Sequence, residues 1–158
     1  MNELIERLQK LKDDRGAMAA LRQGLNKRTC WRTWPYIPEY LSNDRMREIA
    51  QTVAAAFAYH PEARQTGNIG TTCRELVAGG ERSTFDARFQ RLLMAQSVPE
   101  VCRHLRHIIL AAARSNASLE FNQLFEDLKY WPGQRVRIRW ASEYYKKGGE
   151  DVSDESSG

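Results

Sequence analysis

Apolar residues recur three and four positions apart along nearly the whole chain, and this spacing constrains the fold more than any other feature. Such residues share one face of an α-helix, whereas a half-buried strand would alternate apolar and polar residues. The clearest case is a helix expected to begin at Ser42 or Asn43 and to end near Tyr59, before Pro61. Its apolar face comprises Met46, Ile49, Ala50, Val53 and Phe57. The spacing predicts an all-α fold, a single compact bundle of about seven to nine helices.

Near the N-terminus the helical pattern is interrupted. Residues 2–28 are predicted to form one interrupted helix or two short ones, since Gly16 separates two groups of apolar residues. Pro35 and Pro38 then exclude a regular helix, because proline lacks a backbone N–H and its ring clashes with the preceding turn. We expect a rigid crossing segment there, which carries the aromatic residues Trp31, Trp34, Tyr36 and Tyr40.

A polar loop over residues 60–70, ending in Gly67-Asn68-Ile69-Gly70, follows the long central helix. Next comes Thr72-x-x-Glu75, which matches the capping box, in which a hydroxyl and a carboxylate three residues apart each accept a hydrogen bond from the other residue's backbone N–H. We therefore expect a short helix from Thr72 to about Ala78, ended by Gly79-Gly80.

Three more helices are expected before the C-terminal segment. Ser83 or Thr84 can cap the first of them. Ser97-x-x-Glu100 is a second capping box, and Pro99 suits the first turn because the N–H that it lacks is not needed there. An apolar stripe over residues 121–128 marks the third helix.

The segment from Gln134 to Lys147 follows a turn at Trp131-Pro132-Gly133 and is ambiguous. Residues 135–140 alternate as in a strand, but they continue without a turn signal into residues 141–147, which do not alternate. We favour a helix, in which Arg137 points to the largely apolar side and needs an acidic partner or an external polyanion. That helix would have an apolar seam of Val136, Trp140 and Tyr144 and a basic face of Arg135, Arg139 and Lys146.

Charge is unevenly distributed along the chain. The 24 Lys and Arg and 20 Asp and Glu give a net charge of +4, yet residues 150–158 hold four acids and no base. Without that segment the chain has 24 basic and 16 acidic residues, a net charge of +8. We expect one domain over residues 1–149 and a flexible acidic tail over residues 150–158. A domain this basic makes nucleic acid a candidate partner.

Several classes of protein are excluded by composition. The chain is 42% hydrophobic and 28% charged, which suits a globular domain with a core. No apolar stretch reaches the roughly 20 residues that span a membrane, and the acidic start Met1-Asn2-Glu3 differs from a secretory signal, so no membrane is expected as a partner. Cys30, Cys73 and Cys102 are odd in number and form no CxxC pair, which argues against disulfides and zinc and favours a cytoplasmic location.

Catalytic and metal chemistry have little support, and no cofactor is expected. His104-x-x-His107 could bring two ligands together on a helix, but residues 101–119 supply no carboxylate, and Arg103 and Arg106 would repel a cation. The Gly67–Gly70 loop lacks the Gly-Lys-Ser/Thr end of a P-loop, so we interpret it chiefly as a loop and cap, with backbone contact to a nucleic-acid phosphate as the alternative. No hydrolase motif is present, so we do not expect an enzyme.

Arginine clusters are the remaining sign of function. Arg103 and Arg106 lie in residues 101–119, which contain no acid, and further clusters lie within residues 15–28 and 82–91. One such cluster is more often a solvated helix face. Several in one acid-poor domain indicate a phosphate-binding surface, which the planar guanidinium group suits. Trp31, Trp34 and Trp140 could stack on bases, although core positions are the commoner role for large aromatic residues.

Eight short motifs occur in a recognisable order between residues 15 and 147. They are Arg15–Arg22, Ile37–Tyr40, Ala54–Ala58, Thr66–Gly70, Arg88–Leu93, Leu105–Ile109, Phe121–Trp131 and Arg139–Tyr145. Their order and spacing resemble those of the small subunit, CasB type, of the type I-E CRISPR Cascade complex, an RNA-guided surveillance assembly with a role in antiviral defence.

The resemblance implies an all-helical, non-catalytic subunit, present in two copies, that contacts the backbone and large subunits and the guide RNA. It also implies that basic side chains hold the target DNA and the displaced strand of the R-loop. The candidate nucleic-acid-binding residues are Arg22, Arg88, Arg91, Arg103, Arg106, Arg137, Arg139 and Lys146. Two alternatives remain open: a free-standing helical DNA- or RNA-binding regulator, and a metal-dependent enzyme that uses His104 and His107.

Overall fold

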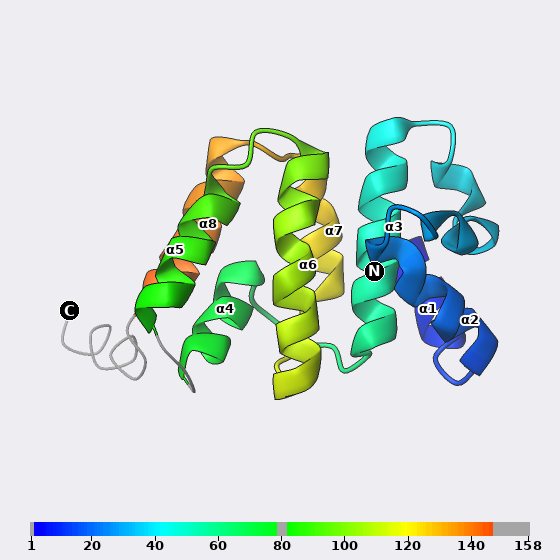
Figure 1. The fold of residues 1–158 in the computed structure, drawn as a ribbon, viewed down its shortest axis with the longest axis horizontal. Coiled ribbons are helices and arrows are strands. Elements are labelled where there is room, and N and C mark those ends of the chain that lie inside the picture. Colours follow the sequence, from blue (N-terminus) through cyan, green and yellow to red (C-terminus); the bar gives the residue numbers. More distant parts are fainter. Residues whose placement is uncertain (1, 79–81, 147–158) are drawn as a thin grey trace.

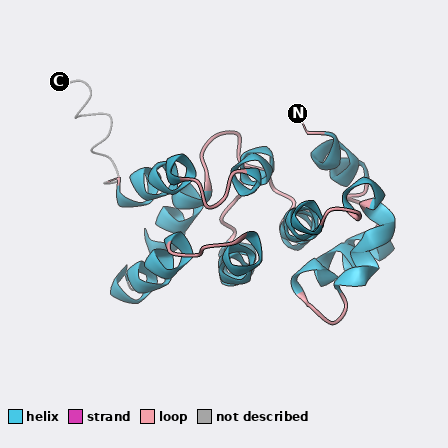
Figure 2. Ribbon diagram, turned by 90° about the horizontal axis from the view of Figure 1, so that it is seen from above, coloured by secondary structure: helices cyan, strands magenta, loops and turns pink. Residues whose placement is uncertain are grey.

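The computed structural model describes residues 2–78 and 82–146, and the regular structure within these ranges is helical (Figures 1 and 2). The predicted all-α fold is confirmed. The α-helices are α1 (Glu3–Lys10), α2 (Arg15–Arg22), α3 (Asp44–Tyr59), α4 (Ile69–Ala78), α5 (Arg82–Leu93), α6 (Val98–Ser115), α7 (Phe121–Lys129) and α8 (Gln134–Tyr145). Three 3-10 helices are η1 (Gln23–Leu25), η2 (Cys30–Tyr36) and η3 (Pro38–Tyr40).

Helix α3 lies at the centre of the arrangement and packs against α2, α6 and α7 (Figure 1). Helices α1 and α2 lie at one end of the molecule and α5 and α8 at the other, while α7 lies behind α6. Every residue of α3 from Ile49 to Ala58 is buried, and five of these ten are alanines. Small side chains let neighbouring helices approach closely, so α3 can be covered on nearly every side.

At the N-terminus one of the two predicted forms is found, but the break between the helices lies at residues 11–14, and Gly16 lies inside α2. Residues 2–28 contain two short helices, capped by the side chains of Asn2 and Asp14. The proline-containing segment forms 3-10 helices in place of a regular α-helix, as its composition required. Of the two predicted caps for α3, Asn43 is the one used: its Oδ1 accepts a hydrogen bond from the backbone N–H of Met46 at 2.9 Å.

The predicted start of α4 at Thr72 is wrong by three residues. The helix begins at Ile69, where Asn68 Oδ1 accepts a hydrogen bond from the Gly70 N–H at 2.8 Å. Thr72 is buried, and its hydroxyl donates to the carbonyl oxygen of Ser118 at 2.9 Å. The Thr72 backbone N–H already donates to the carbonyl oxygen of Asn68 at 3.2 Å, so Thr72 lies inside the first turn and is not its cap. The predicted terminator Gly79-Gly80 lies outside the described residues.

The predicted starts of the next two helices have different outcomes. Arg82 is already helical, so neither Ser83 nor Thr84 is the N-cap of α5. At α6 the box is half confirmed: Ser97 Oγ accepts a hydrogen bond from the Glu100 N–H at 3.2 Å, but the Glu100 carboxylate accepts from the N–H of Gln96 at 3.1 Å.

The ambiguous C-terminal segment is helix α8, and its predicted apolar seam of Val136, Trp140 and Tyr144 is buried. The Trp140 indole N–H donates to Asp127 Oδ2 at 2.8 Å, which ties α8 to α7. Helix α4 also packs closely on α8, because Gly70 has no side chain: a Cβ there would lie 2.0 Å from the Trp140 carbonyl oxygen. The predicted acidic tail, residues 150–158, lies outside the described residues.

Candidate nucleic-acid interface

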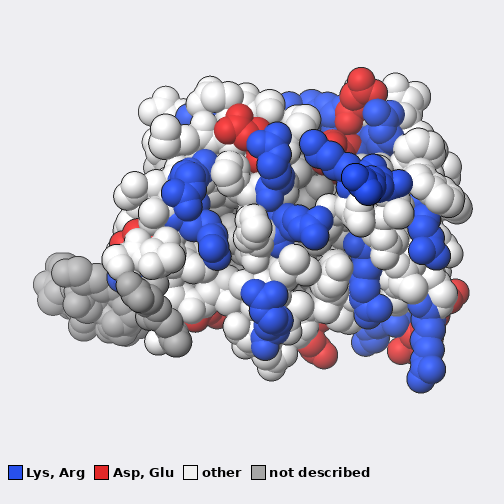
Figure 3. Space-filling view, in the orientation of Figure 1, with Lys and Arg blue, Asp and Glu red and all other residues white. Residues whose placement is uncertain are grey.

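Four of the predicted arginines lie on the neighbouring helices α5 and α6. Arg88 and Arg91 come from α5, and Arg103 and Arg106 come from α6. Helix α6 is strongly amphipathic, so burial of its apolar stripe leaves Arg103 and Arg106 exposed. Figure 3 shows that the face bearing α5 and α6 carries many more basic than acidic side chains. We call these four residues the α5/α6 arginine face.

Three members of this face make no direct polar contact with the described residues. Arg88, Arg91 and Arg103 form no hydrogen bond or ion pair with any described residue. Arg106 differs, because its Nη1 donates to the carbonyl oxygen of Leu25 at 2.7 Å and so ties α6 to η1. The unpaired guanidinium groups are available to an external anion without breaking any contact in the described fold.

The charges of Arg91 and Arg103 also act on His104 of α6. Burial is the largest cause that lowers the pKa of His104, and the two arginines lower it further against the opposing charge of Glu100. The smaller contribution of the two arginines shows that both guanidinium charges are close enough to act on the same part of the surface. This supports the interpretation of the α5/α6 arginine face as a site for polyanions.

Arg22 lies on α2, apart from that face. Its Nε donates to the carbonyl oxygen of Ala58 at 3.2 Å, and its guanidinium carbon lies 6.0 Å from the centroid of the Tyr59 ring. Lys12 and Arg15 line the same shallow pocket. The predicted N-terminal cluster therefore exists as a separate basic surface, with Arg22 held in place by α3.

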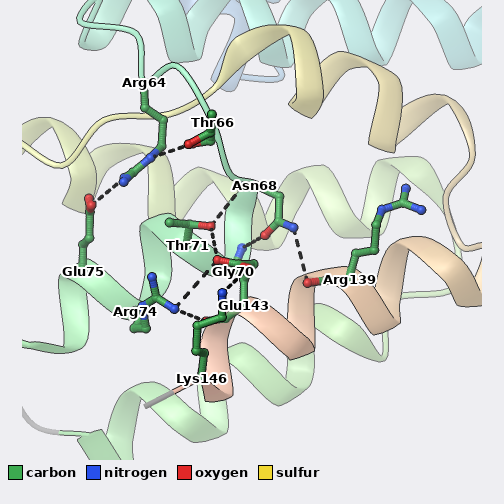
Figure 4. A network of polar contacts seen from close by, with 10 residues as sticks. All are labelled: Arg64, Thr66, Asn68, Gly70, Thr71, Arg74, Glu75, Arg139, Glu143 and Lys146. Carbon is green, nitrogen blue, oxygen red and sulfur yellow. Dashed lines mark hydrogen bonds and ion pairs between the residues drawn. The ribbon is translucent and has the colours of Figure 1, made fainter. Parts of the chain in front are cut away.

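Arg139 and Lys146 lie at a second polar site, a pocket of about 480 Å³ beside the Gly67–Gly70 loop (Figure 4). The sequence did not predict its other two cations, Arg64 and Arg74. Those residues belong to the loop before α4 and to α4 itself, and only tertiary packing of α4 on α8 brings them to this place. We call this site the polar basin.

Each cation of the polar basin already has an acidic partner. Arg64 pairs with Glu75 at 2.6 Å, and Arg139 contacts the buried Asp127 at 3.3 Å. Glu143 pairs with the other two cations, at 3.8 Å from Arg74 and 3.0 Å from Lys146. Its carboxylate also accepts a hydrogen bond from the Thr71 hydroxyl at 3.0 Å. Burial opposes ionisation of Glu143, but the hydrogen bonds from Lys146 and Thr71 and the charge of Arg74 lower its pKa overall. The cations of the polar basin are thus paired with carboxylates of the described fold, unlike Arg88, Arg91 and Arg103 of the α5/α6 arginine face.

The sequence argument allowed Arg137 an acidic partner or an external polyanion; no acidic partner is found among the described residues, and the polyanion stays a prediction. Its Nη2 donates to the carbonyl oxygen of Ala95 at 2.9 Å, and its guanidinium carbon lies 5.5 Å from the Trp131 ring centroid. Its Nε is buried without a hydrogen-bond partner among the described residues. A carbonyl dipole and an aromatic ring therefore take the place of the expected carboxylate.

The tryptophans also differ from the expectation. Trp140 is fully buried, as a core residue should be, whereas Trp31 and Trp34 are 56% and 40% exposed. Trp34 is nevertheless held, because its indole N–H donates to Gln51 Oε1 at 2.8 Å. The proline-rich crossing segment keeps these two rings at the surface.

Among the described residues, no three His, Cys, Asp or Glu side chains are grouped as metal ligands would be. None of the helices in these ranges combines the length and apolar character of a membrane span.

The all-helical fold is shared by several solved structures of CRISPR-associated proteins. CasB from Thermus thermophilus is 25% identical, with a TM-score of 0.73, over 90% of this chain and 95% of that one. CasB from Thermobifida fusca has the same fold at 18% identity, with a TM-score of 0.72, over 90% and 96% of the two chains. A chain of a structure described as a CRISPR RNA-guided surveillance complex also shares the fold, at 22% identity and a TM-score of 0.76 over 97% and 95%.

The sequence profile described as CRISPR-associated protein Cse2 matches residues 17–145. The chain therefore belongs to the Cse2 family. A comparison with curated proteins found no match. The resemblance to CasB-type small subunits drawn from eight short motifs is confirmed by the family match and by the Thermus thermophilus structure.

Proposed function

We propose that this protein is a non-catalytic, cytoplasmic small subunit of a type I-E Cascade complex, which binds nucleic acid and stabilises the R-loop. Its partners are the backbone and large subunits, the guide RNA, the target DNA and displaced strand, and a second copy of itself. Membership of the Cse2 family supports a place in an RNA-guided surveillance complex, and so does the shared fold with a chain of a CRISPR RNA-guided surveillance complex.

The observation that carries the nucleic-acid part of this proposal is the set of unpaired arginines on the α5/α6 arginine face. A phosphate that approaches Arg88, Arg91 or Arg103 gains a charge-assisted hydrogen bond without displacing an internal partner. A phosphate at the polar basin would compete with Glu143, Glu75 and Asp127 for its cations. We therefore assign the main contact to α5 and α6, and a weaker one to Arg139 and Lys146.

Modest contacts of this kind suffice for R-loop stabilisation. The guide RNA–DNA hybrid is about as stable as the DNA duplex that it replaces, so the exchange is nearly balanced. Phosphate contacts with the separated strands can shift such a balance without reading bases, because base pairing with the guide supplies the sequence specificity.

The test is to assemble the surveillance complex with and without this protein and to measure the lifetime of its R-loop on a matched target duplex. We expect the protein to co-purify with the other subunits and guide RNA, and we expect its omission to shorten the lifetime. Equal lifetimes would refute the proposal.

A further inference from the structure

A pocket of about 490 Å³ lies beside the α5/α6 arginine face and is separate from the polar basin. It is lined by residues of η1, the start of η2, α3 and α6, and the exposed Arg103 and Arg106 are among them. Pockets that hold small ligands commonly measure about 300–1,000 Å³, so one nucleobase fits this volume. A strand whose phosphates contact Arg103 and Arg106 would pass directly beside the opening.

The walls of the pocket suit a flat, largely apolar ring. Leu25, Pro99 and Cys102 contribute apolar surface from η1 and α6. Burial raises the pKa of the Cys102 thiol to about 12, so this side chain is neutral and acts as a wall rather than a nucleophile. Apolar side chains of this kind are what unstacked bases pack against in other binding pockets.

Glu48 of α3 also lines the pocket, and its carboxylate has no hydrogen-bond partner among the described residues. Burial is the largest influence on this group and raises its pKa, although Lys27, Arg47 and Arg103 act in the opposite direction. A partly buried carboxylate without donors reduces the stability of the fold. A pocket-lining carboxylate with no donor among the described residues therefore suits a ligand that brings N–H groups.

The charges around the pocket restrict what that ligand can be. Lys27, Arg103 and Arg106 outnumber the single carboxylate, so a cationic side chain of a partner protein would meet net repulsion. A ligand with N–H donors inside and a negative group outside fits both features. A nucleotide has this combination, with the base in the pocket and the phosphate at the arginines.

We propose that this pocket holds one unpaired nucleobase of the strand bound at Arg103 and Arg106, with Glu48 accepting hydrogen bonds from the base. This inference rests on the proposed function and adds a base contact to it. Guanine fits best, because its adjacent ring N–H and amino N–H groups can each donate to one carboxylate oxygen. Thymine fits worst, because carbonyl oxygens flank its single N–H and would face the carboxylate.

The experiment measures fluorescence anisotropy of labelled single-stranded oligothymidylates of one length, with the full chain at low salt. The central nucleotide is thymine, guanine or an abasic residue. We expect the guanine probe to bind roughly five-fold more tightly than the thymine probe, as expected for one carboxylate–base contact. In Glu48→Gln and Glu48→Ala variants the guanine preference should be lost, with no loss of affinity for the thymine probe.

The control variant is Glu62→Gln, which removes the same charge from an exposed residue remote from the pocket lining. It should bind every probe slightly more tightly and keep the guanine preference. Equal binding of all probes by the unmodified protein, or a preference that survives Glu48→Ala, overturns the base pocket while leaving the proposed function intact. Absence of binding to any probe overturns both. If Glu48→Gln instead weakens co-purification with the other subunits and leaves the base preference unchanged, the pocket holds a protein side chain and the inference is wrong.

Discussion

Replacing Arg88, Arg91 and Arg103 together by glutamine should weaken binding of single-stranded DNA without destabilising the protein. None of the three donates a hydrogen bond or forms an ion pair within the described residues, so the substitutions break no internal contact. Surface substitutions of this kind change the free energy of unfolding by about 0.5 kcal/mol or less each. The melting temperature of the variant should therefore stay close to that of the unmodified protein.

The size of the binding effect follows from counterion release. Each phosphate neutralised on a single strand contributes about 0.7 to the slope of log affinity against log salt concentration, so three lost contacts lower the slope by about 2. Between about 50 and 200 mM salt, a slope difference of 2 corresponds to a change of roughly fifteen- to twenty-fold in relative affinity. The ratio of the affinity of the unmodified protein to that of the variant should therefore fall by this factor as the salt concentration rises through this range.

The assay is a salt titration of oligothymidylate binding by fluorescence anisotropy, with thermal melting of the same samples. A matched variant, Arg28→Gln with Arg32→Gln and Arg135→Gln, removes the same charge from three exposed arginines outside the α5/α6 arginine face. It should change the slope much less. An unchanged slope in the first variant, or an equal reduction in the control, would refute the assignment of phosphate contacts to α5 and α6.

Three further predictions concern stability and are checked by thermal or denaturant unfolding. Gly70→Ala should destabilise the fold by about 2 kcal/mol or more, because its Cβ would lie 2.0 Å from the Trp140 carbonyl oxygen. The control, Gly16→Ala in the open first turn of α2, should be neutral or stabilising by up to about 1 kcal/mol. Equal effects of the two substitutions would contradict the packing of α4 on α8. Asp127→Ala should cost about 3 kcal/mol, since it leaves the Trp140 indole N–H without its acceptor, and a loss below about 1 kcal/mol would contradict this role. Glu48→Gln should stabilise the fold near neutral pH. Burial raises the Glu48 pKa in the folded state, so the stability of the unmodified protein relative to the variant is greatest below the usual glutamate pKa and falls as the pH rises. A stability gain of the variant that grows on acidification would contradict this prediction.

Local sequence signals predicted those parts of the fold where neighbours in the chain decide the structure. Asn43 caps α3 and Ser97 caps α6, because each bond joins residues three positions apart. The seam of α8 was predicted because its period depends only on the helix itself. The start of α4 was predicted wrongly, since the helix begins at Ile69, after Asn68, where Gly70 packs closely on α8.

The candidate site could be predicted only in part. Amphipathicity of α6 predicted that Arg103 and Arg106 would be exposed, but nothing in the sequence indicated that Arg106 bonds to Leu25 while Arg103 stays unpaired. The polar basin was missed because Arg64 and Arg74 meet α8 only through tertiary packing. Partner choice among charged side chains is decided by contacts distant in sequence, and periodicity contains no information about those contacts.

The most direct test of the central claim is the dissociation rate of the R-loop in the assembled complex that carries the Arg88→Gln, Arg91→Gln, Arg103→Gln variant. We predict normal assembly with the other subunits and guide RNA, and R-loop dissociation that is faster than with the unmodified protein and more so at low salt, where phosphate contacts are strongest. A variant complex that assembles normally and holds the R-loop as long as the unmodified one would contradict the claim that these arginines bind the DNA strands.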